Sequence, residues 1–211
     1  MNTTLNDHLP LIAIIRGVTP DTVIDVANIL IEEGFTMIEV PLNSPQALQS
    51  IKMLVDEFGT QKYLIGAGTV TNLELAEQVI ATGANLVVTP NCVPEVISRS
   101  VAAGCATFPG IVTPTEAFNA LHAGATGLKL FPISMVGIAG MKAMMSVLPQ
   151  GTGLYPVGGI DPSIDSMKPY VGAGAAGFGL GSSLYKPTMT LADIRQNARN
   201  FVNNFKACLP V

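Results

Sequence analysis

Tryptophan is absent from the sequence, and charged residues make up only 12% of its 211 amino acids. Charged residues usually account for roughly 25% of a soluble protein, and disordered chains carry more charge and fewer apolar residues. With 48% hydrophobic residues, this chain is expected to fold around a large core. Its 11 Lys and Arg residues are scattered among 15 Asp and Glu residues, so no basic surface for nucleic acid is expected.

Cysteine and histidine are also scarce. The three cysteines, Cys92, Cys105 and Cys208, are an odd number without Cys-x-x-Cys spacing, which is typical of reduced thiols rather than of a disulfide framework. The two histidines, His8 and His122, lie far apart in the sequence. This distribution argues against a zinc site, and we expect no bound metal.

Long hydrophobic runs are missing as well, although the mean hydropathy is high at +0.45. A membrane-spanning helix needs about 18 or more consecutive apolar residues, whereas glycine, proline or a polar residue interrupts each apolar stretch here. The first residues show neither the charged region nor the apolar region of a signal peptide. We therefore expect a protein of the cytoplasm that has no membrane partner.

The sequence does contain a regular alternation of short apolar runs and longer helical segments. Strands are expected at Leu11–Ile15, Met37–Leu42, Leu64–Ala67, Leu86–Thr89, Ala106–Phe108, Gly127–Phe131, Leu154–Val157 and Gly177–Leu180. Helices are expected at Asp21–Glu33, Pro45–Phe58, Leu73–Ala81, Pro94–Ala103, Pro114–Ala123, Gly140–Leu148, Pro162–Val171 and Leu191–Phe205. Proline beside a capping residue marks several helix starts, as in Asp161-Pro162.

This alternation predicts the α/β fold class. Strands that alternate with helices form parallel sheets, and the expected strands are apolar at nearly every position, as in strands buried on both faces. Eight such units without a spare strand favour a single-domain (β/α)8 TIM barrel over residues 1–211. An open doubly wound sheet is the alternative, but no Gly-x-Gly-x-x-Gly motif follows the first strand. In a TIM barrel the active site lies at the carboxyl ends of the strands.

Two charged residues stand alone inside apolar strands: Lys129 in Gly-Leu-Lys-Leu-Phe-Pro, and Glu39 in Met-Ile-Glu-Val-Pro. Burial lowers the pKa of a lysine, and the neutral amine can attack a carbonyl to form a Schiff base. The second and sixth strands of a barrel lie opposite each other, so Glu39 could face Lys129 and shuttle protons. Alternatively, Lys129 pairs with a carboxylate at the strand end, and Glu39 forms a structural ion pair with Arg16 or Lys129.

Other strand ends carry groups suited to binding anions. Arg16 follows the first strand and could bind a carboxylate or a phosphate, or form a salt bridge with Glu39. Thr69 ends a glycine-rich third strand and could donate its hydroxyl, although small residues also suit a tight turn. Glycine-rich loops follow the seventh and eighth strands at Gly158-Gly159 and Gly181-Ser182. Loops in this position bind phosphate in TIM barrels, the alternative being two flexible turns.

Over nearly its whole length the sequence resembles the class I aldolases of 2-dehydro-3-deoxy-6-phosphogluconate and -galactonate. The matching segments are Leu-Ile-Ala-Ile-Ile-Arg-Gly (11–17), Ile-Glu-Val-Pro-Leu-Asn-Ser-Pro (38–45), Gly-Ala-Gly-Thr-Val (66–70), Thr-Pro-Asn (89–91), Leu-Lys-Leu-Phe-Pro (128–132), Val-Gly-Gly (157–159) and Gly-Ser (181–182).

This resemblance implies a role for each matching residue. Lys129 is the Schiff-base lysine and Glu39 is the proton shuttle. The residues that line the pyruvate end are Thr69, Pro90 and Phe131, and those that hold the phosphate are Gly158, Gly159 and Ser182. The family also implies a homotrimer that acts on a phosphorylated keto-sugar acid without a metal or any other cofactor.

Two departures from the gluconate branch resemble the galactonate branch. The segment after Glu39 reads Pro-Leu-Asn-Ser without an arginine, so the carboxylate-binding role is expected to pass to Arg16. Val157 stands where the gluconate branch has threonine, and we expect it beside the middle of the substrate. These departures imply cleavage of 2-dehydro-3-deoxy-6-phosphogalactonate to pyruvate and glyceraldehyde 3-phosphate. The alternatives are an aldolase of 2-dehydro-3-deoxy-6-phosphogluconate or 4-hydroxy-2-oxoglutarate, a phosphate-binding barrel isomerase or synthase, and a non-catalytic phospho-sugar sensor.

Overall fold

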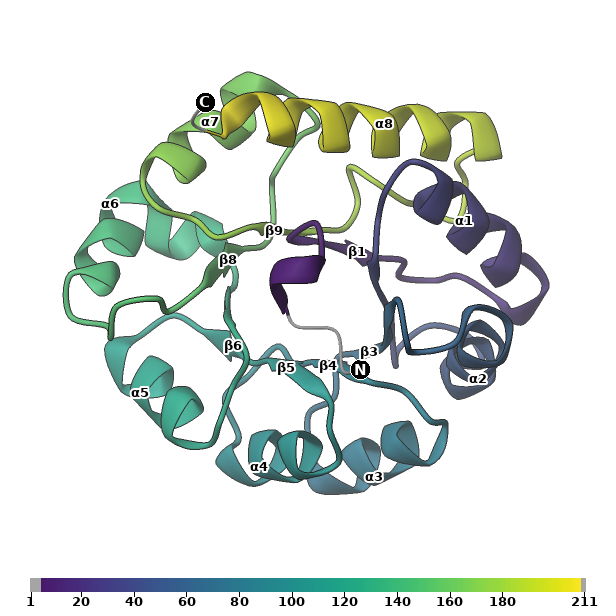
Figure 1. Ribbon diagram of the computed structural model, residues 1–211, viewed down its shortest axis with the longest axis horizontal. Coiled ribbons are helices and arrows are strands. Elements are labelled where there is room, and N and C mark those ends of the chain that lie inside the picture. The colour runs from purple at the N-terminus through teal and green to yellow at the C-terminus, as the bar shows by residue number, and fades with distance from the viewer. Residues whose placement is uncertain (1–4, 210–211) are drawn as a thin grey trace.

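The computed structural model describes residues 5–209, in which short strands lie at the centre and helices lie outside them (Figure 1). The elements follow one another in the order η1 (Leu5–Asp7), β1 (Leu11–Ile14), α1 (Pro20–Glu32), β2 (Met37–Pro41), α2 (Ala47–Phe58), β3 (Leu64–Gly68), α3 (Leu73–Ala81), β4 (Leu86–Val88), α4 (Pro94–Ala102), β5 (Ala106–Phe108), β6 (Gly110–Ile111), α5 (Pro114–His122), β7 (Leu128–Leu130), α6 (Ile133–Met145), β8 (Leu154–Pro156), α7 (Ile164–Gly172), β9 (Phe178–Leu180) and α8 (Leu191–Cys208).

All paired strands in the described residues are parallel, as expected when helices connect them. Six strands form one sheet in the order β5-β4-β3-β2-β1-β9, and three form another in the order β6-β7-β8. A bridge between Val157, which follows β8, and Gly179 of β9 lies where these sheets approach each other. The strands curl around a common centre (Figure 1). The predicted α/β class with a parallel sheet is confirmed.

Apolar side chains pack on both faces of the curled strands. The larger cluster lies between strands and helices, and every one of the eight α-helices contributes to it. The smaller cluster contains Ile12, Met37, Leu64, Leu86, Val88, Phe108 and Tyr155. Along β1, Ile12 alternates with Leu11 and Ala13 of the larger cluster, so the smaller cluster fills the inside of the curl. Leu5 of η1 packs against it, and η1 lies at the centre of Figure 1.

Two elements differ most from the sequence prediction. The chain continues beyond β5 as β6, a strand that the prediction omits; β5 pairs with β4, whereas β6 pairs with β7. Pro109 lies between them, and because proline has no N–H it cannot continue a ladder. The helix predicted at Gly140–Leu148 begins earlier, at Ile133, and ends at Met145. Gly137 interrupts this helix with φ 64° and ψ 179°. The residues before Gly137 form only one short turn, which is too short to show a helical pattern in the sequence.

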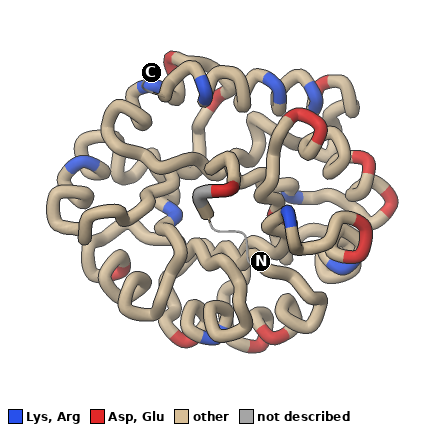
Figure 2. The backbone as a smooth tube through the Cα atoms, in the orientation of Figure 1, with Lys and Arg blue, Asp and Glu red and all other residues tan. Residues whose placement is uncertain are grey.

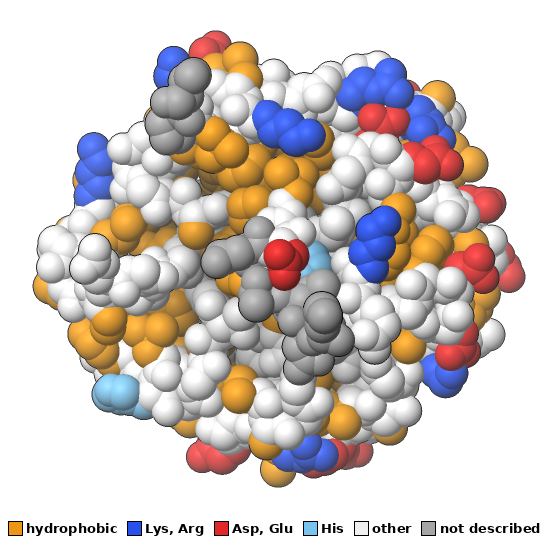
Figure 3. Space-filling view, in the orientation of Figure 1, with side chains coloured by type: hydrophobic (Ala, Val, Ile, Leu, Met, Phe, Trp, Pro, Cys, Tyr) orange, Lys and Arg blue, Asp and Glu red, His pale blue; other side chains and the backbone are white. Residues whose placement is uncertain are grey.

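Charged residues lie mainly on the helices at the outside of the molecule (Figure 2). On the face that carries η1, basic and acidic side chains are scattered between uncharged and apolar ones (Figure 3). None of the helices in the described range 5–209 combines the length and the apolar character that crossing a membrane requires.

Candidate active site

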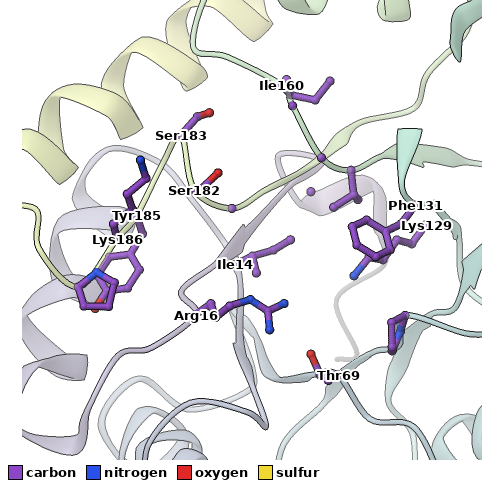
Figure 4. A pocket seen from close by; sticks show the side chains of 17 residues that line it. Ile14, Arg16, Thr69, Lys129, Phe131, Ile160, Ser182, Ser183, Tyr185 and Lys186 are labelled. Carbon is purple, nitrogen blue, oxygen red and sulfur yellow. The ribbon is translucent and has the colours of Figure 1, made fainter. Parts of the chain in front are cut away.

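A cavity of about 420 Å³ opens among the residues at the carboxyl ends of the strands (Figure 4). It brings together every predicted site residue except Glu39, namely Arg16, Thr69, Pro90, Lys129, Phe131, Val157, Gly158, Gly159, Gly181 and Ser182. Glu39 is buried on β2, and its charge acts on the lysine that lines the cavity. The residues singled out in the sequence therefore form one site, although they come from seven different strands and the loops after them.

Lys129 is the middle residue of β7 and only 7% of its surface is exposed. Its amine Nζ lies 4.9 Å from the centre of the Phe131 ring, within the range of a cation–π contact. Burial lowers the pKa of this amine, the nearby Arg16 charge lowers it further, and the Glu39 charge acts in the opposite direction. Lys129 therefore offers the cavity an amine that loses its proton more readily than an ordinary lysine.

Glu39 is the middle residue of β2 and is only 1% exposed. Within the described part of the chain its Oε2 has no hydrogen-bond partner, and its carboxyl group forms no salt bridge. The structural ion pair with Arg16 or Lys129 is therefore not found. Burial raises the pKa of Glu39 to about 7, against the opposing effects of the Lys129 and Arg16 charges. The carboxyl group can accept or release a proton near neutral pH.

The space for the Glu39 carboxyl group depends on Gly68, the last residue of β3. A Cβ atom at this position would lie 2.0 Å from Glu39 Oε2 and 2.4 Å from its Oε1, far closer than non-bonded atoms approach. Any side chain at Gly68 would therefore displace the carboxyl group. The next residue, Thr69, has φ 59°, a left-handed conformation that is strained for a β-branched residue. Thr69 points its hydroxyl into the cavity (Figure 4).

Arg16 follows β1 and extends into the cavity. Its Nη1 donates a hydrogen bond to Asn43 Oδ1 at 2.5 Å, and no salt bridge joins it to Glu39 among residues 5–209. The guanidinium group points towards Thr69 and Lys129 and away from Ser182 (Figure 4). Its positive charge lowers the pKa of Lys129 and that of Glu39, so Arg16 lies at the lysine end of the cavity.

The opposite end of the cavity is built from the loops after β8 and β9. Gly158 and Gly159 have φ 101° and 75°, in the left-handed region that favours glycine. The Ser183 hydroxyl donates to the Asp161 carboxylate at 3.0 Å and joins the two loops. The sequence predicted a helix that begins at Asp161-Pro162, but α7 begins at Ile164. Ser163 caps this helix, because its side chain accepts a hydrogen bond from the Ser166 N–H. Backbone N–H groups of such loops and the Ser182 hydroxyl are suited to a phosphate.

Several residues that line the cavity were not found from the sequence: Ile14, Ile160, Gly179, Ser183, Tyr185, Lys186 and Pro187. Ile14 and Gly179 lie in strands that were predicted correctly. Because side chains alternate between the two faces of a strand, assigning each strand residue to the inner or outer face could have found them. Tyr185, Lys186 and Pro187 belong to the segment between β9 and α8, which carries no strand or helix pattern. No residue pattern indicated that this segment turns back over the cavity.

The arrangement combines an amine of lowered pKa, a carboxyl group that titrates near neutral pH, and cationic or N–H donors at both ends of the cavity. An amine in such a place can form a Schiff base with a ketone, and the carboxyl group can move a proton nearby. Among the described residues, no group of three or more His, Cys, Asp or Glu side chains is placed to hold a metal ion.

Comparison with known proteins agrees with this chemistry. The chain is 45% identical over 198 residues to the 2-dehydro-3-deoxy-6-phosphogalactonate aldolase of Escherichia coli (strain K12), which covers 94% of this chain and 95% of that protein. It is 32% identical over 160 residues to the 2-dehydro-3-deoxy-phosphogluconate aldolase of Treponema pallidum (strain Nichols), which covers 74% and 75% respectively.

A solved structure of native KDPGal superimposes on this one with a TM-score of 0.92 and 43% sequence identity, covering 99% of this chain and 98% of that one. The family model of the KDPG and KHG aldolases matches residues 3–197. Because this match spans nearly the whole chain, including the cavity and the strands that build it, the chain belongs to the KDPG and KHG aldolase family.

Proposed function

We propose that this chain is a class I aldolase that cleaves 2-dehydro-3-deoxy-6-phosphogalactonate to pyruvate and D-glyceraldehyde 3-phosphate. The observation that carries this proposal is the Lys129 amine, which lines the cavity yet is almost fully buried and has a lowered pKa. The lowered pKa makes this lysine more reactive, because it increases the fraction of neutral amine, which is the nucleophile for ketones.

The reaction begins when Lys129 Nζ attacks the C2 carbonyl carbon of the substrate. Loss of water leaves a protonated imine, which withdraws electrons from C3. Glu39, directly or through a water molecule, then takes the proton of the C4 hydroxyl, the C3–C4 bond breaks, and its electron pair forms an enamine on the lysine. The aldehyde departs as glyceraldehyde 3-phosphate. Protonation of the enamine at C3 and addition of water release pyruvate and restore the amine.

The cavity has a group for each part of this substrate. Arg16 and Thr69 face the carboxylate at the pyruvate end, where Pro90 and Phe131 supply apolar walls. The residues that receive the phosphate are Gly158, Gly159, Gly181 and Ser182. Lys129 lies at the Arg16 end of the cavity, so a substrate held at both ends places its C2 carbonyl, which is bonded to the carboxylate carbon, near the amine.

The galactonate substrate is favoured over the gluconate substrate by two observations. The galactonate relative is 45% identical over 94% of this chain, whereas the gluconate relative is 32% identical over 74%. In addition, Val157 lines the cavity one residue before the Gly158-Gly159 pair. A valine offers no hydrogen bond, so a C4 hydroxyl directed at it loses water without gaining a partner.

Replacing Val157 with threonine is expected to shift the preference towards the gluconate epimer. Threonine has nearly the same shape and adds a hydroxyl, and the unmet hydrogen bond in the native enzyme costs about 1–3 kcal/mol, which corresponds to roughly 5- to 150-fold in specificity. The measurement is kcat/KM for both epimers with both proteins. A native enzyme that prefers the gluconate epimer, or a ratio that the substitution leaves unchanged, would show that Val157 does not set the specificity.

Reductive trapping tests the proposed reaction class. The native protein is incubated with pyruvate and borohydride, and the mass of the intact protein and of its peptides is measured. A stable mass gain on the peptide that contains Lys129 supports the aldolase. Absence of an adduct, or an adduct on another residue, would favour an isomerase, a synthase or a non-catalytic sensor that shares only the phosphate-binding loops.

We further propose that the strands close into a complete (β/α)8 barrel, that the chain forms a single domain, and that three copies assemble in the cytoplasm. The bridge between Val157 and Gly179 supports closure, and the continuous larger apolar cluster from β1 to α8 supports a single domain. Exposed apolar residues on and beyond α6, including Met135 and Val147, support self-association. Sedimentation of a monomer at micromolar concentration would contradict the trimer.

A further inference from the structure

Two consecutive residues of the loop between β2 and α2 hold the loop that carries Arg16. Asn43 Oδ1 accepts the hydrogen bond from Arg16 Nη1 at 2.5 Å, and Ser44 Oγ accepts from the backbone N–H of Gly17 at 2.9 Å. Ser44 is buried, and its own N–H donates to the carbonyl oxygen of Pro41 at 2.8 Å. The loop after β2, the strand that carries Glu39, is therefore hydrogen-bonded directly to Arg16 and Gly17.

The backbone beside Arg16 is confined from the other side as well. Gly17 has φ 86°, and a Cβ atom there would lie 2.8 Å from Cγ of Pro187, a residue that lines the cavity. Gly17 is thus packed between Ser44 and Pro187, which determines where the Arg16 side chain leaves the backbone. An exposed arginine keeps several rotatable bonds, so a second contact is needed to order its guanidinium group. The contact with Asn43 meets this need.

We propose that Asn43 is a positioning residue that holds the Arg16 guanidinium group at the Lys129 end of the cavity, where it binds the carboxylate of the substrate. The inference rests on the proposed aldolase function. An amide oxygen is suited to this task, because it accepts one N–H of the guanidinium group without neutralising its charge. The remaining N–H donors and the full positive charge stay available for a carboxylate.

Schiff-base formation with two ketones isolates this role. Pyruvate carries a carboxylate, whereas acetone has a methyl group in its place and offers Arg16 no carboxylate to bind. The probe is the initial rate of borohydride trapping at low concentrations of each ketone, measured as mass gain on the protein. Asn43→Ala is expected to slow trapping of pyruvate by about 3- to 30-fold, as for a hydrogen bond to a charged group at an exposed site, and to leave trapping of acetone unchanged.

A double-mutant cycle tests whether Asn43 acts through Arg16. Arg16→Ala is expected to slow pyruvate trapping by more than Asn43→Ala does, and Asn43→Ala should then have no additional effect in the Arg16→Ala protein. The matched control is Gln49→Ala, which removes an exposed amide in the first turn of α2 and should change neither rate. Thermal unfolding of each variant confirms that the protein is folded.

Three results would overturn the inference while leaving the aldolase intact: an Asn43→Ala protein that traps pyruvate at the native rate, one that loses pyruvate and acetone trapping equally, and an effect that persists in the Arg16→Ala protein. If native protein forms no adduct with pyruvate, the proposed function itself fails. The two failures are therefore distinguishable in one set of measurements.

Discussion

A Lys129→Met variant is expected to form no adduct with pyruvate and borohydride, and to lose aldol cleavage by roughly 10⁴- to 10⁶-fold, as when a covalent nucleophile is removed. Methionine is similar in length to lysine and suits the Phe131 ring that lies beside the Lys129 side chain, but it has no amine. Replacing a buried amine by an apolar group should not lower the Tm. The measurements are intact-protein mass after trapping, kcat/KM and Tm.

The matched control for this prediction is Lys186→Met. Lys186 also lines the cavity, but it is exposed and lies in the segment after β9. Trapping should persist in Lys186→Met and map to Lys129. An adduct that survives in Lys129→Met and disappears in Lys186→Met would mean that Lys186 forms the Schiff base, which would contradict the prediction.

The fold could be predicted well because its local signals agree with one another. Each strand is a short apolar run, several helices begin next to a threonine or proline, and most helices end shortly before a glycine. The prediction failed where one residue overrides the pattern. Pro109 ends the pairing of β5 with β4, so that the next residues pair with β7 as β6. Gly137 breaks the helical conformation of α6, and the turn before it is too short to show a helical pattern of apolar residues in the sequence.

The candidate site could be predicted only as far as its residues are unusual in their own strands. Lys129 and Glu39 are recognisable because a single charge in an apolar strand needs a reason. The contacts that support them join distant parts of the chain, as Gly68 does by leaving room for Glu39 and Asn43 by binding Arg16. Such contacts depend on the positions of neighbouring strands in space, which a single sequence does not contain.

Glu39→Gln is expected to keep pyruvate trapping while lowering aldol cleavage by roughly 10²- to 10⁴-fold, the usual contribution of a general acid–base group. Glutamine has the shape of glutamate, so it fits the space that Gly68 leaves, but it cannot accept the proton of the C4 hydroxyl. Trapping with pyruvate breaks no C3–C4 bond and needs only Lys129. The control is Glu95→Gln, an exposed carboxylate in the first turn of α4, which should cleave at the native rate.

The pH dependence of cleavage separates a catalytic Glu39 from a structural one. Its pKa is raised to about 7, so below pH 7 the carboxyl group is protonated and cannot act as a base; kcat/KM should rise as the pH rises through about 7. In Glu39→Gln this limb should disappear. The neutral amine of Lys129 is also required, but the Glu39 charge raises its pKa, so the remaining limb should move to lower pH in the variant. An unchanged profile and near-native turnover in Glu39→Gln would mean that the buried carboxyl group takes no part in proton transfer.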